Sequence, residues 1–136
     1  QTSVPGIFAC GNVLHVHDLV DFVSEESARA GQAAVAFIRE QGAGAQYIRV
    51  EDGFGVRGTV PQRLAVAALQ EPVKLSFRPA KVFKNARLVV EADGVLVQQS
   101  KRRILTPGEM ASITLKPQDL AGRKVKEKLT VKVVAE

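Results

Sequence analysis

The stretch Thr2-Ser-Val-Pro-Gly-Ile-Phe-Ala-Cys-Gly-Asn12 organises the first part of this 136-residue chain. A Pro-Gly pair precedes four apolar residues, Ile7 to Cys10, and a glycine and a side-chain amide follow them at once. A short apolar run that stops at such a corner is typical of a buried strand in an α/β sheet, which delivers a polar group to a ligand at its carboxyl end. The stretch therefore predicts a strand over residues 7–10, with Gly11 and Asn12 at its ligand-facing end.

A helix is predicted after this corner, over about residues 19–40. Small and apolar residues recur there at steps of three and four, which gives the helix one apolar stripe. Ser24 or Asp21 could cap its start, and Gly42 followed by Gly44 ends it. The predicted stripe consists of Val23, Ser27, Ala30, Ala34, Phe37 and Ile38.

The run T-x-x-P-G-[apolar]-[aromatic]-A-x-G-[Asp or Asn] resembles the second flavin-binding motif of the pyridine nucleotide-disulfide oxidoreductase superfamily, whose members bind FAD. The segment that follows, residues 15–26, is most similar to the flavoproteins associated with anaerobic glycerol-3-phosphate dehydrogenase. The resemblance implies that residues 1–45 are a strand-and-helix remnant of a FAD-binding Rossmann-like domain. It also implies a parent that is a FAD-dependent, NAD(P)H-linked oxidoreductase, in which hydride passes between nicotinamide and flavin.

The same resemblance implies a set of flavin contacts. Gly11 and Asn12 would contact the ribityl chain, while Val23, Ser24 and Glu25 would supply backbone contacts near the ring. The unpaired N–H groups and the positive end of a helix favour negative charge, so they stabilise the anion that forms when flavin is reduced. Asn12 stands where the family commonly has Asp, which keeps the contact with a hydroxyl but loses the charge.

The Gly-x-Gly-x-x-Gly turn that binds the pyrophosphate of FAD in this superfamily does not occur in the sequence. The segments 42–44 and 53–55 have two glycines each but lack the third glycine and the flanking strand and helix. We therefore expect the chain to be the carboxyl-terminal portion of a longer flavoprotein, inactive by itself and binding FAD weakly or not at all. Its expected partners are the other domains of that parent. A second copy of the protein and a redox-partner subunit are possible further partners.

The residues His15, His17 and Asp18 raise the question of a metal site. Two histidines two residues apart, without a second ligand cluster, rarely complete a coordination shell. We prefer a loop that covers the cofactor or contacts substrate, and we predict neither a metal nor a catalytic residue. The single cysteine, Cys10, excludes an internal disulfide and is interpreted as a packing residue rather than a nucleophile.

From residue 46 the helical period gives way to alternating apolar and polar residues, with turn signals about every eight to twelve residues. The clearest strand is residues 73–79, and Ala92-Asp-Gly94 joins two longer strands in a predicted hairpin. About seven strands predict an immunoglobulin-like or fibronectin-like sandwich over residues 46–136. The fold class is therefore an α+β fragment with two domains, 1–45 and 46–136. Strands are expected at 47–50, 56–60, 73–79, 83–91, 95–105, 111–115 and 129–133, with a helical turn at 117–120.

The net charge of +5 is unevenly distributed. Residues 1–45 hold two basic and five acidic residues, whereas the remainder holds 17 basic and nine acidic residues. A basic domain raises the question of nucleic acid, but the few aromatics do not interleave with Lys and Arg, and no helix-turn-helix or zinc-ligand spacing occurs. The run Lys101-Arg-Arg103 is interpreted as a solvated strand face, with Arg102 on the opposite side, or as a patch that steers a partner subunit.

No apolar run is long enough to cross a membrane and no signal segment is evident, so a soluble, cytoplasmic protein is predicted. Two functions from different classes remain open. In the first, residues 1–45 complete the flavin site of the oxidoreductase and the β domain mediates oligomer or redox-partner contacts. In the alternative, the chain is a non-catalytic β-sandwich module that binds another protein.

Overall fold

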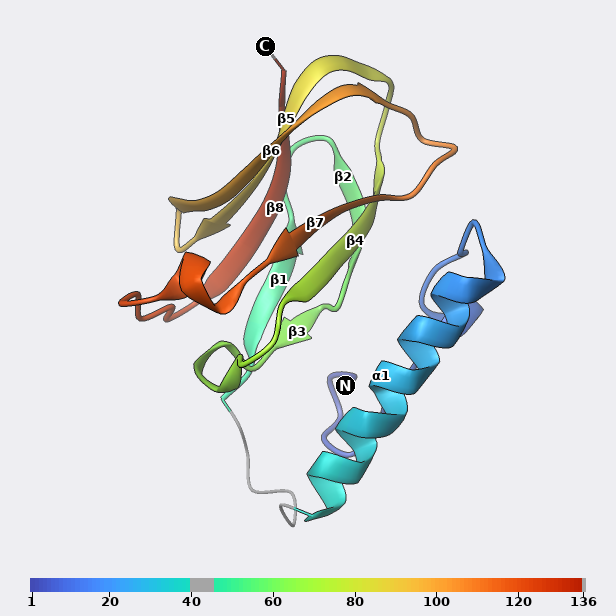
Figure 1. Cartoon of the computed structure of the whole chain (residues 1–136), viewed down its shortest axis with the longest axis vertical. Helices are drawn as coiled ribbons and strands as arrows, with labels where there is room; N and C mark the ends of the chain where they lie inside the picture. The colour runs from blue at the N-terminus through green and yellow to red at the C-terminus, as the bar shows by residue number, and fades with distance from the viewer. Residues whose placement is uncertain (40–45, 136) are drawn as a thin grey trace. The chain divides into compact units, whose positions relative to one another are not determined.

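A helix and two β-sheets occupy separate parts of the chain (Figure 1). The computed structural model describes residues 1–39 and 46–135, which fall into two units, Gln1–Ala45 and Gln46–Glu136. Among the described residues, the first unit holds the helix and the second holds the strands. In the part that the structure describes, the protein is therefore a small α+β molecule with one α-helix and a sheet-rich body, as predicted. No helix in the described ranges combines the length and the apolar character needed to span a membrane.

Helix α1 (Val20–Arg39) begins within a residue of the predicted start, and the predicted end at residues 40–44 lies outside the described residues. Its half-buried side chains form one stripe, which keeps most of the predicted positions but not Ile38, whose side chain is 74% exposed. Ser27 is exposed as well, so the stripe is rotated from the predicted one. No residue of α1 is fully buried. The half-buried residues are Phe22, Val23, Glu26, Ala30, Ala34 and Phe37.

The predicted strand over residues 7–10 is wrong, because this segment pairs with no strand among the described residues. It runs along α1 instead. The ring of Phe8 packs edge-on against Phe37 with 6.0 Å between centroids, and further on Gly11 lies against the side chain of Val23. A strand needs a neighbouring backbone for its N–H and C=O groups. In the first unit the neighbour of this segment is helix α1, whose backbone groups are already hydrogen-bonded within the helix.

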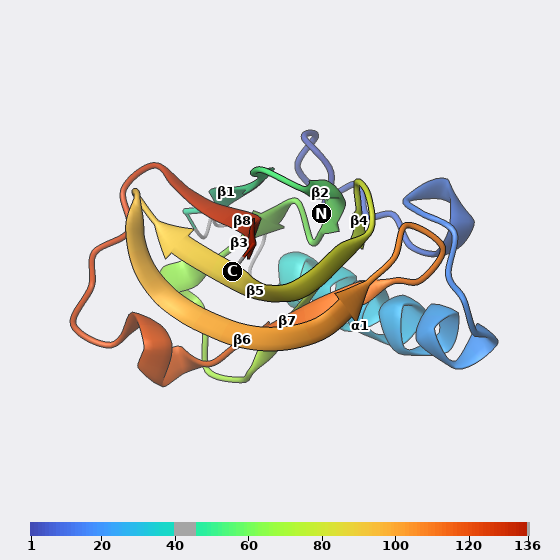
Figure 2. The same ribbon diagram turned by 90° about the horizontal axis from the view of Figure 1, so that it is seen from above.

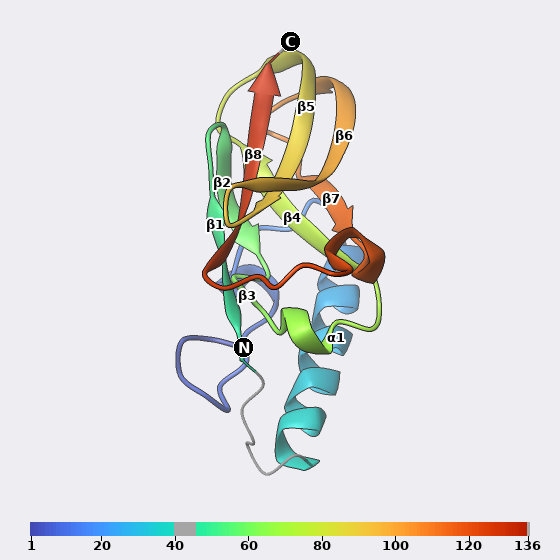
Figure 3. The ribbon, with the colours of Figure 1, turned by 90° about the vertical axis from the view of Figure 1, so that its left-hand side faces the viewer.

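The second unit is built from two sheets (Figure 3). One has five strands in the order β3-β1-β8-β5-β6, and the other has three in the order β2-β4-β7. Neighbours are antiparallel in both sheets except for β1 and β8, which run parallel. The strands are β1 (Ile48–Asp52), β2 (Val56–Val60), β3 (Arg63–Leu64), β4 (Val73–Pro79), β5 (Phe83–Ala92), β6 (Val95–Leu105), β7 (Ala111–Leu115) and β8 (Lys128–Ala135).

A single apolar core lies within this unit and is supplied by both sheets. On β4, Leu75 and Phe77 are fully buried while the residues between and beside them are only partly so. The same alternation on β7 and β8 confirms the predicted period-two pattern of these strands. Complete burial of a side chain of this size stabilises by about 1.5–3 kcal/mol. The core therefore belongs to a β-sandwich. Its fully buried large side chains are Phe77, Leu75, Leu88, Leu115, Leu129, Val90, Val131, Val133 and Pro79.

Most of the predicted strands are confirmed to within one or two residues, and so are the helical turn η3 (Pro117–Leu120) and the hairpin at Asp93 and Gly94. Both turn residues have positive φ, 48° and 83°, as a tight hairpin turn requires. The periodicity of the sequence does not predict β3 or the 3₁₀ turn η2 (Val66–Ala68), because neither is long enough to show a period. The predicted end of β1 is also too early, since Asp52 still pairs with a residue of β8.

Figure 2 shows β5 and β6 bending together along their length. On β6, Lys101 and Arg103 are exposed while Arg102 is half-buried on the other face, as predicted. The Arg102 guanidinium donates to the carbonyl oxygen of Ser112 at 3.0 Å and to Oγ of Ser100 at 2.6 Å. Because Ser112 lies on β7, this arginine links an edge of one sheet to an edge of the other.

Candidate functional site

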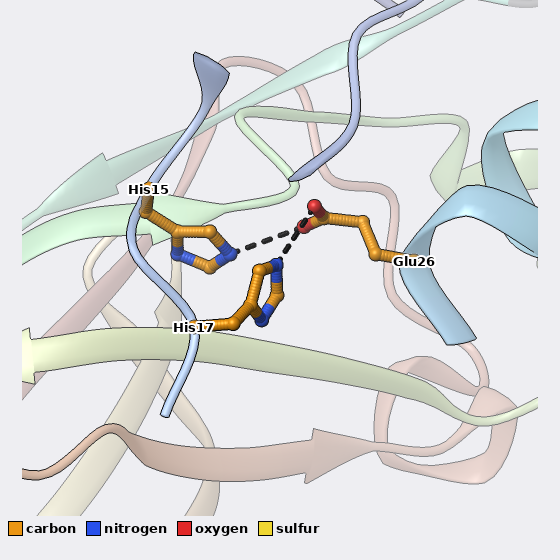
Figure 4. A group of neighbouring side chains, drawn as sticks. All are labelled: His15, His17 and Glu26. Atoms are coloured by element: carbon orange, nitrogen blue, oxygen red, sulfur yellow. Dashed lines mark hydrogen bonds and ion pairs between the residues drawn. The ribbon is translucent and has the colours of Figure 1, made fainter. Parts of the chain in front are cut away.

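Three polar side chains of the first unit converge on one point (Figure 4). His15 and His17 come from the loop before α1, and Glu26 comes from the second turn of the helix. The Nε2 atom of His15 lies 3.1 Å from Oε1 of Glu26, and Nε2 of His17 lies 2.9 Å from Oε2. The two imidazole rings meet edge to face, with 4.3 Å between their centroids. We call these three residues the His–His–Glu cluster.

The loop reaches the helix because the chain turns at Gly11. This residue has φ +72°, a conformation that glycine adopts at little cost, and it opens the 3₁₀ turn η1 (Gly11–Val13). Its N–H donates to Oε2 of Glu26 at 2.6 Å, and its carbonyl accepts from the N–H of Leu14 at 2.9 Å. The turn thus places one backbone donor against the Glu26 carboxylate. It also directs the residues that follow, including both histidines, toward the same carboxylate.

The cluster is shielded from solvent. The exposed fractions of the side chains are 11% for His15, 5% for His17 and 15% for Glu26. Burial of Glu26 raises its pKa, but the hydrogen bonds from His17 and from the N–H of Gly11, with the nearby imidazoles, outweigh burial and hold that pKa below the usual 4.5. The carboxylate therefore stays ionised in a largely buried position, with donors on both oxygens.

Glu26 is the member that sequence reasoning missed. The residues predicted from sequence include its neighbour Glu25 as a flavin contact, and Asp18 as the acid beside the two histidines. One signal was available: Glu26 lies three residues after Val23 and four before Ala30, so the helical period places it on the apolar stripe. An acidic residue on such a stripe needs a buried partner, and the nearest candidates along the chain are the two histidines.

Among the predicted flavin contacts, the structure brings Gly11 and Val23 together. A Cβ on Gly11 would lie 3.7 Å from Cγ1 of Val23, and the glycine is buried while Val23 is half-buried. Asn12 follows in η1 with its side chain exposed. The corner and the first turns of α1 are therefore neighbours, and the amide of Asn12 is accessible beside them.

The other two predicted contact residues lie on the exposed side of α1. The hydroxyl of Ser24 donates to the carbonyl of Val20 at 3.3 Å, so it bonds back within the helix rather than capping its start. Glu25 forms an exposed ion pair with Arg29 one turn later, at 3.0 Å. Neither side chain belongs to the His–His–Glu cluster.

Two carboxylates of the second unit are bound by backbone N–H groups and act as structural acceptors. Asp52 accepts from the N–H groups of Gly58 and Thr59 at 2.7 and 2.9 Å, and from the Thr59 hydroxyl at 2.6 Å. Asp93 accepts from three successive N–H groups of residues 126–128. These contacts fix turns, and they leave the His–His–Glu cluster as the most chemically distinctive group in the described chain.

Comparison of the chain with protein-family models, with curated proteins and with solved structures finds no match. The fold and the site together define a small α+β protein whose β-sandwich accompanies a helical unit carrying a buried His–His–Glu cluster. The resemblance to flavoproteins stays a prediction based on the motif at residues 2–12.

Proposed function

We propose that residues 1–39 complete the flavin site of a FAD-dependent, NAD(P)H-linked oxidoreductase of which this chain is the carboxyl-terminal portion. The observation that carries the proposal is the corner at Gly11 and Asn12. The glycine is in the left-handed conformation against Val23, and the amide that follows is exposed next to the first turns of α1. This arrangement offers a ligand a backbone turn, a side-chain amide and a helix amino end together.

The residues at the corner can contact the polar ribityl chain of such a cofactor. The Asn12 amide can donate to and accept from a ribityl hydroxyl, and the amino end of α1 favours negative charge because its first N–H groups have no partner within the helix. Bound FAD would supply the hydride-accepting chemistry. The contribution of this chain is to orient the cofactor and to place a positive helix end beside it.

The proposal is tested on the longer protein that contains this chain. We expect it to be yellow when purified, with about one FAD per chain and flavin absorbance that bleaches on addition of NADH or NADPH. Replacing Asn12 by alanine removes a hydrogen bond worth about 0.5–1.5 kcal/mol and should weaken FAD binding about three- to tenfold, whereas Asn12→Asp should retain it. Gln32→Ala, an exposed change on α1, is the matched control. A colourless parent that takes up no added FAD would contradict the proposal.

A second candidate function, a β-sandwich that binds a protein partner, is favoured by strand β6. It is an edge strand that pairs with β5 alone among the strands of its sheet. Ile104, next to the basic residue 103, is 60% exposed, and Val95 and Leu96 at the opposite end of the strand are 53% and 45% exposed. Exposed edges accept further strands, and basic residues steer an acidic partner. The same surface serves the first proposal as the site of oligomer or redox-partner contacts.

Charge reversal at residues 101 and 103 tests this surface. The double variant Lys101→Glu with Arg103→Glu should abolish any self-association or partner binding, measured by light scattering and by co-purification with the parent's own redox partner. Lys124→Glu, in an exposed loop, is the control. Unchanged association in the double variant would exclude the β6 edge as the contact surface.

A further inference from the structure

We propose that the His–His–Glu cluster is a binding site for a divalent metal ion of the zinc type. The ligand atoms of His15, His17 and Glu26 all lie within 4.8 Å of one another. They come from a loop and a helix that the Gly11 turn brings together, and each side chain is at least 85% shielded from solvent. The inference goes beyond the proposed flavin function and does not depend on it.

The spacing of the ligand atoms is close to that of a metal shell. Zinc bonded at 2.0–2.1 Å in tetrahedral geometry sets its ligand atoms about 3.3 Å apart. The observed separations between ring nitrogen and carboxylate oxygen are 3.1 Å for His15 and 2.9 Å for His17. The ligand atoms of all three residues lie within 4.8 Å of one another, so side-chain adjustments could bring them around an ion that replaces these two hydrogen bonds.

The donor set suits zinc. Two imidazole nitrogens and one carboxylate oxygen make the three-ligand combination that leaves a fourth position for water in zinc sites. The N–H of Gly11 would remain on Oε2 of Glu26 and orient the carboxylate, as outer hydrogen bonds do around metal ligands. The Glu26 carboxylate would also supply negative charge to the bound cation.

The tautomer required for binding is available to His17. A metal on Nε2 needs that nitrogen deprotonated, which moves the ring hydrogen to Nδ1. In the described part of the chain, Nδ1 of His17 is buried without a hydrogen-bond partner. Metal binding at Nε2 would replace the hydrogen bond to Glu26 and would leave the Nδ1 hydrogen without an acceptor among the described residues. The metal–nitrogen bond must outweigh both costs.

Zinc titration of the chain, freed of any affinity tag and of metal, tests the proposal by isothermal calorimetry. We expect one zinc ion per chain and a loss of affinity of at least about tenfold in His17→Ala and in Glu26→Gln. Glu25→Gln changes the adjacent, exposed carboxylate and should bind zinc within about twofold of the unaltered chain. Because the chain has two histidines, His15→Ala with His17→Ala removes both imidazoles and should abolish binding.

Cobalt provides a readout that does not depend on the variants folding. A Co²⁺ ion held by two imidazoles, a carboxylate and a water should give the intense visible bands of four-coordinate cobalt in the unaltered chain. Weak bands of six-coordinate cobalt, no zinc binding, or equal affinity in the double-histidine variant would each overturn the proposal. In the last two cases the cluster would be a hydrogen-bonded clamp only.

Discussion

The backbone N–H of Gly11 lies 2.6 Å from Oε2 of Glu26, which joins the end of the motif at residues 2–12 to the second turn of α1. The same carboxylate accepts from both histidines. One side chain of the helix therefore organises the loop through three hydrogen bonds. This relationship explains how residues 11–17 hold a defined course without belonging to a sheet.

Replacing Glu26 by alanine should loosen the loop and destabilise the first unit. The change leaves the Gly11 N–H and two largely buried imidazoles without their acceptor, and a buried group deprived of its partner costs about 1–3 kcal/mol. Thermal unfolding followed by the helical circular dichroism signal, in the presence of a chelator, measures the effect. Glu25→Ala is the control, since its exposed ion pair contributes about 0.5 kcal/mol or less. Equal midpoints for the two variants would contradict the role of Glu26.

Gly55 should tolerate alanine far less well than Gly94 does. Both have positive φ, 78° and 83°, so each substitution carries about 1–2 kcal/mol of backbone strain. At Gly55 a Cβ would also lie 2.6 Å from Cζ of Phe83, whereas at Gly94 it meets open space. Overpacking adds about 1–3 kcal/mol. Urea unfolding of the two variants should show this difference, and equal losses would mean that Phe83 moves aside freely.

Phe77→Ala should cost about 3–5 kcal/mol of unfolding free energy. The ring is fully buried on β4 in the core of the sandwich, and its removal leaves a cavity that the surrounding strands cannot fill. Denaturant unfolding monitored by the β-sheet circular dichroism signal measures the loss. Val95→Ala removes an apolar side chain that is 53% exposed and should change stability by about 0.5 kcal/mol or less. A similar small change at Phe77 would place the core elsewhere.

Protonation of Asp93 should make the second unit less stable in acid than at neutral pH. Hydrogen bonds from the N–H groups of Lys126 and then Lys128 outweigh desolvation and hold its pKa below the usual 3.8. A carboxyl group whose folded pKa is depressed stabilises the fold above its ordinary pKa, and this stabilisation is lost as pH falls through the folded value. The urea midpoint should therefore drop below about pH 4.

The matched variant for this pH effect is Asp93→Asn, which keeps an acceptor oxygen but cannot titrate. Its urea midpoint should be lower than that of the unaltered chain at neutral pH and should show a shallower fall in acid. Hydrogen exchange of the amides of residues 126–128, which donate to Asp93 at 2.7–3.0 Å, should be faster in the variant. An identical acid profile for both proteins would exclude Asp93 as a source of the pH dependence.

The elements with a long local period could be predicted from sequence. Alternation at residues 73–79 and 111–115 identified strands with one buried face, the three-and-four spacing identified α1, and Asp93-Gly94 identified the hairpin. The two-residue strand β3 could not be found this way. Nor could the parallel pairing of Val50 with Leu129, since periodicity shows which face of a strand is buried but not which strand lies beside it.

The sequence alone determined the helix, most of the strands and the presence of two histidines beside an acidic helix, because propensity and periodicity act over neighbouring residues. Only the tertiary structure shows the course of residues 7–10. They have the composition of a buried strand, but they lie along a helix because no described strand pairs with them. The tertiary structure also selected Glu26, rather than Asp18 or Glu25, as the acid that meets the histidines. Which acid meets the histidines depends on the course that the loop takes along the helix after the turn at Gly11. The spacing of residues along the chain does not show which side chains this course brings together.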